Sequence, residues 1–249
     1  MDVTFVKDYD EMSKIGYELI KEIIETKNEP VISLNSGGSP KGLFKYLVKG
    51  INEGLDISNT TILVLDEFIG PSNASFIVKK FIYDRLLNKI NQQPKNIFFM
   101  NSAAEDINQE ITRYSKILND YPRDLQLLGL GTNGHIAGNE PGTPFNSTMS
   151  FVESRESTIQ ATMKEYNLTR EEAPTTALTL GLSEIMDAEK ILLLISGEHK
   201  AEATKKFLEG DITTKCPVTI LKKSKKAKVI IDASAASLVE NDYEKEFSI

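Results

Sequence analysis

Short apolar runs of strand length alternate with longer stretches of helical periodicity along most of the 249-residue chain. The apolar runs are continuous, which is typical of strands buried on both faces of a parallel sheet. We predict such strands at residues 31–34, 61–65, 96–100, 125–130, 190–195, 217–221 and 229–231. The helical pattern predicts helices at 12–24, 76–90, 107–118 and 198–208, and one that begins at Pro40. The alternation predicts an α/β fold with a mostly parallel, doubly wound sheet covered by helices on both faces.

The length fits one domain spanning residues 1–249, and no stretch has the composition of an interdomain linker. Acidic residues outnumber basic ones by 36 to 29, which argues against the broad basic face that a nucleic-acid partner requires. The single cysteine, Cys216, permits no disulfide within the chain, and residues 1–10 lack the pattern of a signal peptide. No apolar run approaches the ~20 residues of a membrane span. We therefore expect a soluble, cytoplasmic protein with no membrane partner; the sequence does not indicate whether it forms a homo-oligomer.

Two segments do not follow the alternation. Residues 143–174 are polar and irregular and are too long for a simple connection, so we predict that they form a lid. Several lysines between positions 222 and 228 form a small basic cluster, which we interpret as a solvated turn between two strands.

Ligands of parallel sheets bind beyond the carboxyl ends of the strands, so the loops at these ends are the candidate sites. The first is Asn35-Ser36-Gly37-Gly38-Ser39-Pro40. Its glycines let the backbone approach a ligand closely, and the helix that follows offers free N–H groups and the positive end of its dipole. Its glycine spacing is neither that of the dinucleotide-binding fingerprint nor that of the ATP-binding loop. We interpret it as a phosphate-binding loop, the alternative being a plain tight turn.

Two acids, Asp66 and Glu67, follow the second predicted strand. A carboxylate in the crevice at this end of the sheet, with its pKa raised by partial burial, has the properties of a general base. The alternative is that the two acids cap a helix or lie on the surface.

The third loop, residues 129–142, is rich in glycine and contains His135, one of only two histidines. An imidazole can give and take protons near neutral pH, and Asn133 and Glu140 are near enough in sequence to orient its ring. The fourth loop places Lys200 in the first turn of a helix, where its charge opposes the helix dipole unless an anion binds there. His199 is assigned no role. No histidine or cysteine pair has metal-ligand spacing, so we predict neither a metal site nor a cofactor.

Together these segments resemble the glucosamine-6-phosphate deaminase family and, close behind it, the galactosamine-6-phosphate isomerases. The resemblance runs in order over nearly the whole chain. It is carried by Ser-Gly-Gly-Ser-Pro, Leu-Asp-Glu-Phe, Gly-x-Asn-Gly-His-Ile-Ala-x-Asn-Glu-Pro, Ala-Leu-Thr-Leu-Gly-Leu and Ser-Gly-Glu-His-Lys. The related 6-phosphogluconolactonases share the glycines and the histidine, but typically continue with a Ser-Leu-Phe-Pro type of sequence where this chain has residues 139–141.

The resemblance implies a three-layer α/β/α fold and an enzyme that needs no metal. It implies that the substrate is a phosphorylated amino sugar, which the enzyme isomerises with release of ammonia. Asp66 would then be the base at C2, and His135 would open the sugar ring with support from Glu140. Contacts to the phosphate would come from Ser36, Gly37, Gly38, Ser39 and Lys200.

Two positions depart from the family pattern. Many members have an aspartate where this chain has Asn133, which can orient His135 by hydrogen bonding but adds no negative charge. The family also tends to place a phosphate-binding arginine at about Met163, and methionine cannot replace it. Helical geometry is expected to point the adjacent Lys164 elsewhere.

The resemblance favours glucosamine 6-phosphate, giving fructose 6-phosphate, over galactosamine 6-phosphate, giving tagatose 6-phosphate. Two other functions stay open at the level of sequence. One is a lactonase, in which His135 activates water and Asp66 matters less. The other is a module that binds a sugar phosphate without turnover.

Overall fold

The computed structural model describes residues 1–240 of the chain. Its main sheet has seven strands in the order β1-β10-β9-β6-β2-β3-β5, and every neighbouring pair is parallel. The strands are β1 (Asp2–Val6), β2 (Val31–Leu34), β3 (Thr61–Val64), β5 (Asn96–Phe98), β6 (Leu125–Gly129), β9 (Lys190–Ile195) and β10 (Ala227–Asp232). The central strands are almost wholly buried, which explains their continuous apolar sequences.

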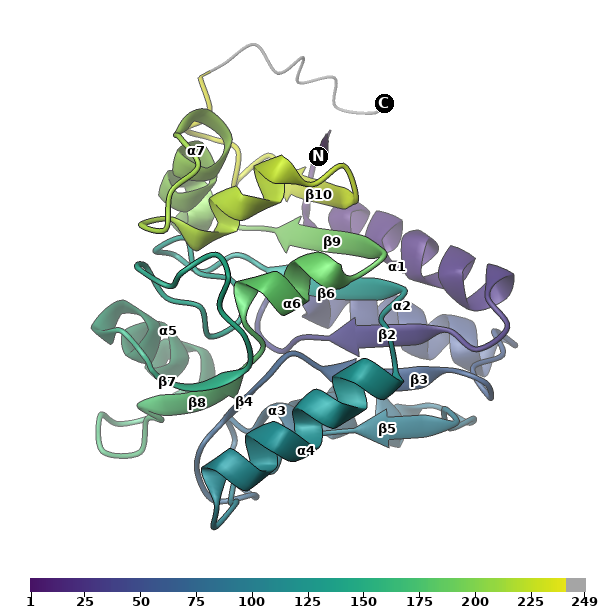
Figure 1. The fold of residues 1–249 in the computed structure, drawn as a ribbon. Coiled ribbons are helices and arrows are strands. Elements are labelled where there is room, and N and C mark those ends of the chain that lie inside the picture. The colour runs from purple at the N-terminus through teal and green to yellow at the C-terminus, as the bar shows by residue number, and fades with distance from the viewer. Residues whose placement is uncertain (241–249) are drawn as a thin grey trace.

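Helices cover both faces of this sheet, as predicted. Helices α1 and α2 lie together behind it, and α4 and α6 cross its front (Figure 1). The α-helices are α1 (Tyr9–Thr26), α2 (Pro40–Asn52), α3 (Val78–Arg85), α4 (Ile107–Asp120), α5 (Glu156–Tyr166), α6 (Leu182–Asp187) and α7 (Ala201–Glu209). Short 3-10 helices are η1 (Leu87–Lys89), η2 (Glu198–Lys200) and η3 (Pro217–Lys223). The chain is therefore the predicted three-layer α/β/α fold with a doubly wound sheet.

The strand order reverses between β2 and β6. From β2 the chain builds outward through β3 to β5, whereas β6, β9 and β10 extend the sheet in the other direction. The two loops that leave this pair of strands diverge to opposite faces and leave a crevice, which is where doubly wound sheets bind ligands. These are the loops that begin at Asn35 and Leu130.

A second, smaller sheet lies at the carboxyl end of the first. It contains β4 (Asp66–Phe68), β8 (Thr176–Thr179) and β7 (Ser150–Glu153), all paired antiparallel. The prediction that residues 61–65 form one strand ending at Asp66 was therefore incomplete. The main-sheet strand ends at Val64, and Asp66 begins the short strand β4.

Five points of the sequence analysis need correction. Residues 217–221 form the 3-10 helix η3 and not a strand, because Pro217 begins a compact turn whose apolar residues pack inward. Strand β1 was missed, since only the last two of its five residues are buried. Residues 76–90 form α3 and η1 separately, and residues 143–174 are not irregular but contain β7 and α5. The basic cluster is not a turn between two strands, because Lys222 and Lys223 form the last turn of η3 and Lys222 donates to the Leu208 and Gly210 carbonyls.

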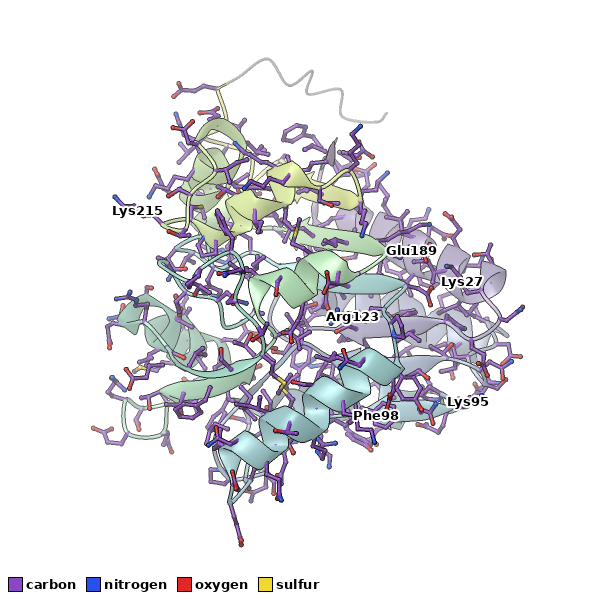
Figure 2. The ribbon with its side chains drawn as sticks, in the orientation of Figure 1. Lys27, Lys95, Phe98, Arg123, Glu189 and Lys215 are labelled. Atoms are coloured by element: carbon purple, nitrogen blue, oxygen red, sulfur yellow. The ribbon has the colours of Figure 1, made fainter. Side chains whose placement is uncertain are left out.

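The opposite edge of the sheet, where the strands begin, is held by surface ion pairs. Lys27, just after α1, pairs with Glu189 at 2.7 Å and with Asp124 at 3.0 Å (Figure 2). These pairs join the starts of β6 and β9, far from the loops that form the crevice. Within residues 1–240, the helices fall short of the length and apolar character that a bilayer span requires.

Candidate active site

A pocket of about 830 Å³ opens at the crevice predicted from the strand order. It gathers loops that are far apart in sequence, those that follow β2, β3, β6 and β9, together with helix α5. The predicted site residues that line it are Ser36, Gly37, Gly38, Ser39, Asp66, His135, Glu140 and Lys200. Asn133 is not in the wall but contacts three residues that are, His135, Glu140 and Ser157.

The loop after β2 is held in place by Tyr9 at the start of α1. The Tyr9 hydroxyl donates to the Gly38 carbonyl at 2.8 Å and accepts the Gly42 N–H at 2.7 Å. Gly37 has φ +95°, and a Cβ added there would meet nothing within 4 Å, so glycine is needed for the backbone angle rather than for space. The loop thus leads into α2 with Pro40 in its first turn, as predicted.

The two neighbouring acids of β4 both contribute to the pocket wall but have different partners. Glu67 accepts the N–H groups of Val78 and Lys79 at 2.7 and 2.9 Å and so caps α3. Asp66 lines the pocket, and among the described residues its Oδ1 atom has no hydrogen-bond partner. Burial raises the pKa of Asp66 to about 7 and that of Glu67 to about 8. The helix-cap interpretation therefore holds for Glu67 only.

The buried Tyr114 of α4 fixes the backbone just before Asp66. Its hydroxyl accepts the Val64 N–H at 2.9 Å and donates to the Val64 carbonyl at 2.7 Å. The ladder to β5 ends one residue earlier, at Leu63. Tyr114 therefore replaces the missing strand neighbour at the point where the chain turns into the pocket.

The small sheet links Asp66 to the histidine loop. In its register Asp66 lies opposite Thr179 of β8, and the Thr179 hydroxyl accepts the Gly138 N–H at 2.9 Å. Asn139 donates to the Leu180 carbonyl at 2.8 Å, which ties the same loop to the end of β8. The Ala-Leu-Thr-Leu-Gly-Leu segment thus sets the position of the loop relative to the carboxylate.

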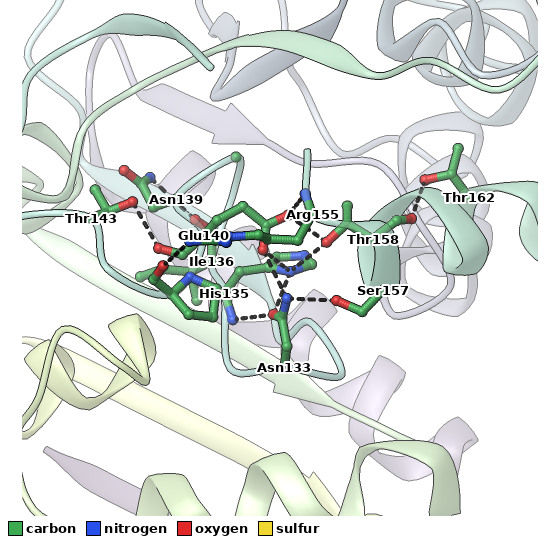
Figure 3. A network of polar contacts seen from close by, with 12 residues as sticks. Asn133, His135, Ile136, Asn139, Glu140, Thr143, Arg155, Ser157, Thr158 and Thr162 are labelled. Atoms are coloured by element: carbon green, nitrogen blue, oxygen red, sulfur yellow. Dashed lines mark hydrogen bonds and ion pairs between the residues drawn. The ribbon is translucent and has the colours of Figure 1, made fainter. Parts of the chain in front are cut away.

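His135 lies in a network of polar contacts with two other residues of its loop and one of α5 (Figure 3). Its Nδ1 atom is 2.8 Å from Asn133 Oδ1 and 3.7 Å from Glu140 Oε2. Asn133 donates to Glu140 at 2.8 Å, and the Thr158 hydroxyl donates to Glu140 Oε1 at 2.5 Å. The ring packs so closely on Gly131 that a Cβ there would lie 2.2 Å from it.

The network determines which nitrogen of His135 carries a proton. Asn133 Oδ1 accepts the backbone N–H of His135 at 3.1 Å, so the amide oxygen faces the ring. An amide oxygen only accepts, so Nδ1 must carry the proton and Nε2 keeps its lone pair. Burial lowers the pKa of His135; Glu140 opposes this effect and Lys200 adds to it. The ring is therefore neutral at pH 7 and can accept a proton at Nε2.

Lys200 lies in η2, at the side of the pocket formed by the loop after β9. Burial lowers its pKa to about 8, with Glu165 opposing the effect. The loop before it is held by the buried Asp232, which accepts the Gly197 N–H at 3.2 Å and the Ser196 hydroxyl. Gly197 has φ +94°, another backbone angle that favours glycine.

Helix α5, from the segment predicted to be a lid, forms one wall of the pocket. Its last turn contributes Lys164, Glu165 and Tyr166, and Glu165 pairs with Lys41 of α2. Contrary to the expectation that Lys164 points elsewhere, Lys164 is among the residues that line the pocket, and Met163 is not. The register of α5 therefore places a cation at the wall where the family arginine was expected.

Sequence reasoning missed the residues that support these groups. Thr158 contacts Glu140 and lies 3.3 Å from His135 Nδ1, and Ser157 accepts from Asn133 at 3.0 Å. Tyr9 and Asp232 were missed as well. Each belongs to an element remote in sequence from the loop that it holds, so no local pattern points to it.

The chain matches the family model described as glucosamine-6-phosphate isomerases/6-phosphogluconolactonase over residues 9–231. The chain belongs to this family. A glucosamine-6-phosphate deaminase from Bacillus cereus (strain G9842) is 37% identical over 254 residues, which cover 100% of this chain and 95% of that protein. One from Bacillus anthracis (strain CDC 684 / NRRL 3495) is also 37% identical, with the same coverage. The family resemblance inferred from the sequence is thereby confirmed.

Solved structures of the glucosamine-6-phosphate isomerase/6-phosphogluconolactonase family show the same architecture. A monomeric glucosamine-6-phosphate deaminase superposes with a TM-score of 0.91 at 37% identity, covering 96% of this chain and all of that one. The 6-phosphogluconolactonase from Trypanosoma brucei superposes with a TM-score of 0.75 at 20% identity, covering 96% and 98%. At that identity the likeness shows the fold alone.

Proposed function

We propose that this protein is a glucosamine-6-phosphate deaminase, which converts glucosamine 6-phosphate and water into fructose 6-phosphate and ammonia. The observation that carries the proposal is the pairing of two proton-transfer groups in one pocket. Asp66 is a carboxylate with a pKa of about 7 and an unpaired oxygen, and His135 is a neutral imidazole with a free Nε2. The similarity to deaminases over the full length of the chain supports the same conclusion.

His135 opens the sugar ring. Only the open-chain aldehyde has an acidic C2 proton, so the pyranose must open first. The Nε2 lone pair takes the proton of O1 as the C1–O5 bond breaks, and the resulting imidazolium returns a proton to O5. Asn133 and Glu140 hold the ring and its Nδ1 proton in place, and the Glu140 charge stabilises the transient imidazolium.

Asp66 then acts as the base at C2. It removes the C2 proton while O1 gains a proton from the substrate ammonium, which gives the enolamine. Asp66 then returns its proton to C1, which leaves an iminium at C2. Water adds to C2 and the C2–N bond breaks, releasing ammonia and the ketose. A positioned general base typically contributes roughly 10²–10⁴-fold in rate, and a pKa near 7 suits one that works near neutral pH.

The phosphate is held at the other end of the pocket. Residues 36–39 offer backbone N–H groups and hydroxyls at the start of α2, and Lys200 supplies a positive charge. Lys164 adds a second cation from α5. Asn133 thus orients His135 where many family members have an aspartate. Lys164 supplies the positive charge that an arginine supplies in the family pattern.

The other functions considered have less support. A lactonase would need His135 as a base for water but has no use for a buried carboxylate of raised pKa at Asp66. A binding module without turnover has no use for either group. Galactosamine 6-phosphate remains the rival substrate, because it differs only at C4. We place the enzyme in the cytoplasm, because a charged sugar phosphate does not cross a membrane unaided.

An ammonia-release assay on both hexosamine 6-phosphates, with the same preparation, tests this proposal. The expected result is turnover of both or of glucosamine 6-phosphate alone, with the larger kcat/KM for the gluco epimer. A tenfold preference for the galacto epimer would reassign the substrate and leave the roles of Asp66 and His135 intact. Hydrolysis of 6-phosphogluconolactone without ammonia release from either amino sugar would reject the deaminase.

A further inference from the structure

The hydroxyl of Tyr166 is buried in the pocket wall without a hydrogen bond. Tyr166 is the last residue of α5, and its Oη atom is inaccessible to solvent and lacks a hydrogen-bond partner among the described residues. A buried hydroxyl left unpaired is unfavourable, so such groups in a native structure call for an explanation. Two other pocket hydroxyls behave differently, since those of Tyr9 and Thr158 each make close hydrogen bonds.

Groups from both ends of the pocket surround this hydroxyl. Burial raises its pKa, the carboxylates of Glu165, Asp66 and Glu67 add to this effect, and the nearby Ser36 side chain opposes it. Asp66 Oδ1 and Asn35 Oδ1 are likewise buried and unpaired, and both residues line the same pocket. The unpaired polar atoms therefore gather where a polar ligand would lie.

The proposed function indicates which part of the substrate lies beside the Tyr166 hydroxyl. If Asp66 faces C2 and residues 36–39 hold the phosphate on O6, the substrate carbons from C3 to C5 span the space between them. C4 is the middle carbon of that stretch. A phenol hydroxyl there can both donate to and accept from a sugar hydroxyl.

We propose that Tyr166 is a specificity-determining residue whose hydroxyl hydrogen-bonds the C4 hydroxyl of the substrate and so discriminates between the gluco and galacto epimers. This inference rests on the proposed function. In the other epimer the C4 hydroxyl points away from Tyr166. The site then rejects that epimer, because the Tyr166 hydroxyl and the C4 hydroxyl are both left without a hydrogen-bond partner.

The experiment compares wild type and Tyr166→Phe with the parent sugar and its 3-deoxy and 4-deoxy analogues. Binding is measured by calorimetry on the reduced, open-chain amino alditol 6-phosphates, which cannot be isomerised. In wild type the 4-deoxy ligand should bind at least tenfold more weakly than the parent. In Tyr166→Phe the two should bind equally within twofold, and the kcat/KM preference between epimers should shrink at least fivefold. Tyr83→Phe is the matched control. It removes the same hydroxyl oxygen from a ring that stacks on Phe99 outside the pocket, and it should behave as wild type.

The outcomes separate this inference from the proposed function. Equal losses on all three ligands in Tyr166→Phe would overturn it and leave Tyr166 a packing residue of α5. A selective loss on the 3-deoxy ligand would overturn the assignment to C4. Inorganic phosphate should bind wild type and Tyr166→Phe equally within twofold, and a larger change would move Tyr166 to the phosphate end. If neither amino sugar is deaminated, the proposed function fails. The binding comparison would still show whether Tyr166 contacts the C4 hydroxyl of the ligand.

Discussion

At the scale of single residues, the site depends on groups held in states that are unfavourable for the fold. Asp66 is kept in a buried position where its charge is destabilised, and its Oδ1 atom has no partner among the described residues. Glu67, next to it, is fully buried and has two backbone N–H donors. The difference separates the carboxylate proposed to react from one that caps a helix.

Replacing Asp66 by Asn should abolish deamination, because the amide cannot take the C2 proton, while substrate still binds. The measurement is exchange of the C2 proton with deuterated solvent, and exchange at the wild-type rate would remove Asp66 from its role.

The same replacement should stabilise the fold. The folded pKa of about 7 lies above the ordinary value near 3.9, so wild type loses stability as pH rises between these values. Asp66→Asn should therefore have a higher Tm than wild type at pH 8, and the difference in Tm should be smaller at pH 4.5. Each kcal/mol of added stability should raise Tm by about 2–4 °C in a protein of this size.

Replacing Lys200 by Ala should raise KM at least tenfold and change kcat little. A phosphate far from the reacting carbon is held about equally in the ground and transition states, so its loss weakens binding rather than chemistry. Lys206→Ala removes the same charge from the exposed face of α7 and should leave KM unchanged. A collapse of kcat at unchanged KM would show that Lys200 is not a phosphate anchor.

At the scale of elements, helix α5 is attached to the rest of the pocket by an ion pair and by polar contacts with the histidine loop. Glu165 pairs with Lys41 of α2, and both side chains are about one-third exposed. Ser157 and Thr158 contact Asn133, His135 and Glu140 of that loop. A wall attached through partly exposed polar contacts is suited to the lid predicted from the sequence, a role that stays a prediction.

Replacing Glu165 by Gln should therefore let α5 open more readily. An exposed ion pair is worth about 0.2–1 kcal/mol, so the amides of α5 should exchange with deuterium roughly twofold to fivefold faster while those of α1 do not change. Glu171→Gln alters the same charge on an exposed residue after α5 and should have no effect. Identical exchange in wild type and Glu165→Gln would show that the ion pair does not hold the helix.

At the scale of the whole molecule, the fold brings a base and a cation with perturbed pKa values into one pocket. Asp66 must be ionised to act, so kcat/KM should rise as pH passes about 7. Lys200 must be protonated to hold the phosphate, so kcat/KM should fall as pH passes about 8. The expected profile is a narrow bell with its maximum between these values, reporting the free enzyme.

The Lys200→Ala variant checks the alkaline side of this profile. If Lys200 causes the fall, the variant should lose it, and any remaining fall would belong to the amine of the substrate. An acid limb well below pH 6 would contradict the role given to the raised pKa of Asp66.

Local sequence was enough to predict the fold class and to place the groups proposed to react at one pocket. Continuous apolar strands alternating with amphipathic helices allow little other than a covered parallel sheet, and the loops at one edge of such a sheet must meet. Asp66, His135 and the loop of residues 36–39 were therefore identified from their places after strands. The carboxyl, imidazole and hydroxyl groups that could do the chemistry belong to these short segments, so their residue types can be read from local sequence.

Only the tertiary structure decided what surrounds those groups. It made Glu67 a helix cap and left Asp66 Oδ1 without a partner among the described residues, made residues 217–221 a 3-10 helix, and placed Lys164 in the pocket wall. It also supplied Tyr9, Tyr114, Thr158 and Asp232 from distant elements, and left the Tyr166 hydroxyl unpaired. The physical reason is that hydrogen-bond partners, burial and pKa depend on distances between segments remote in sequence, which no single stretch of the chain determines.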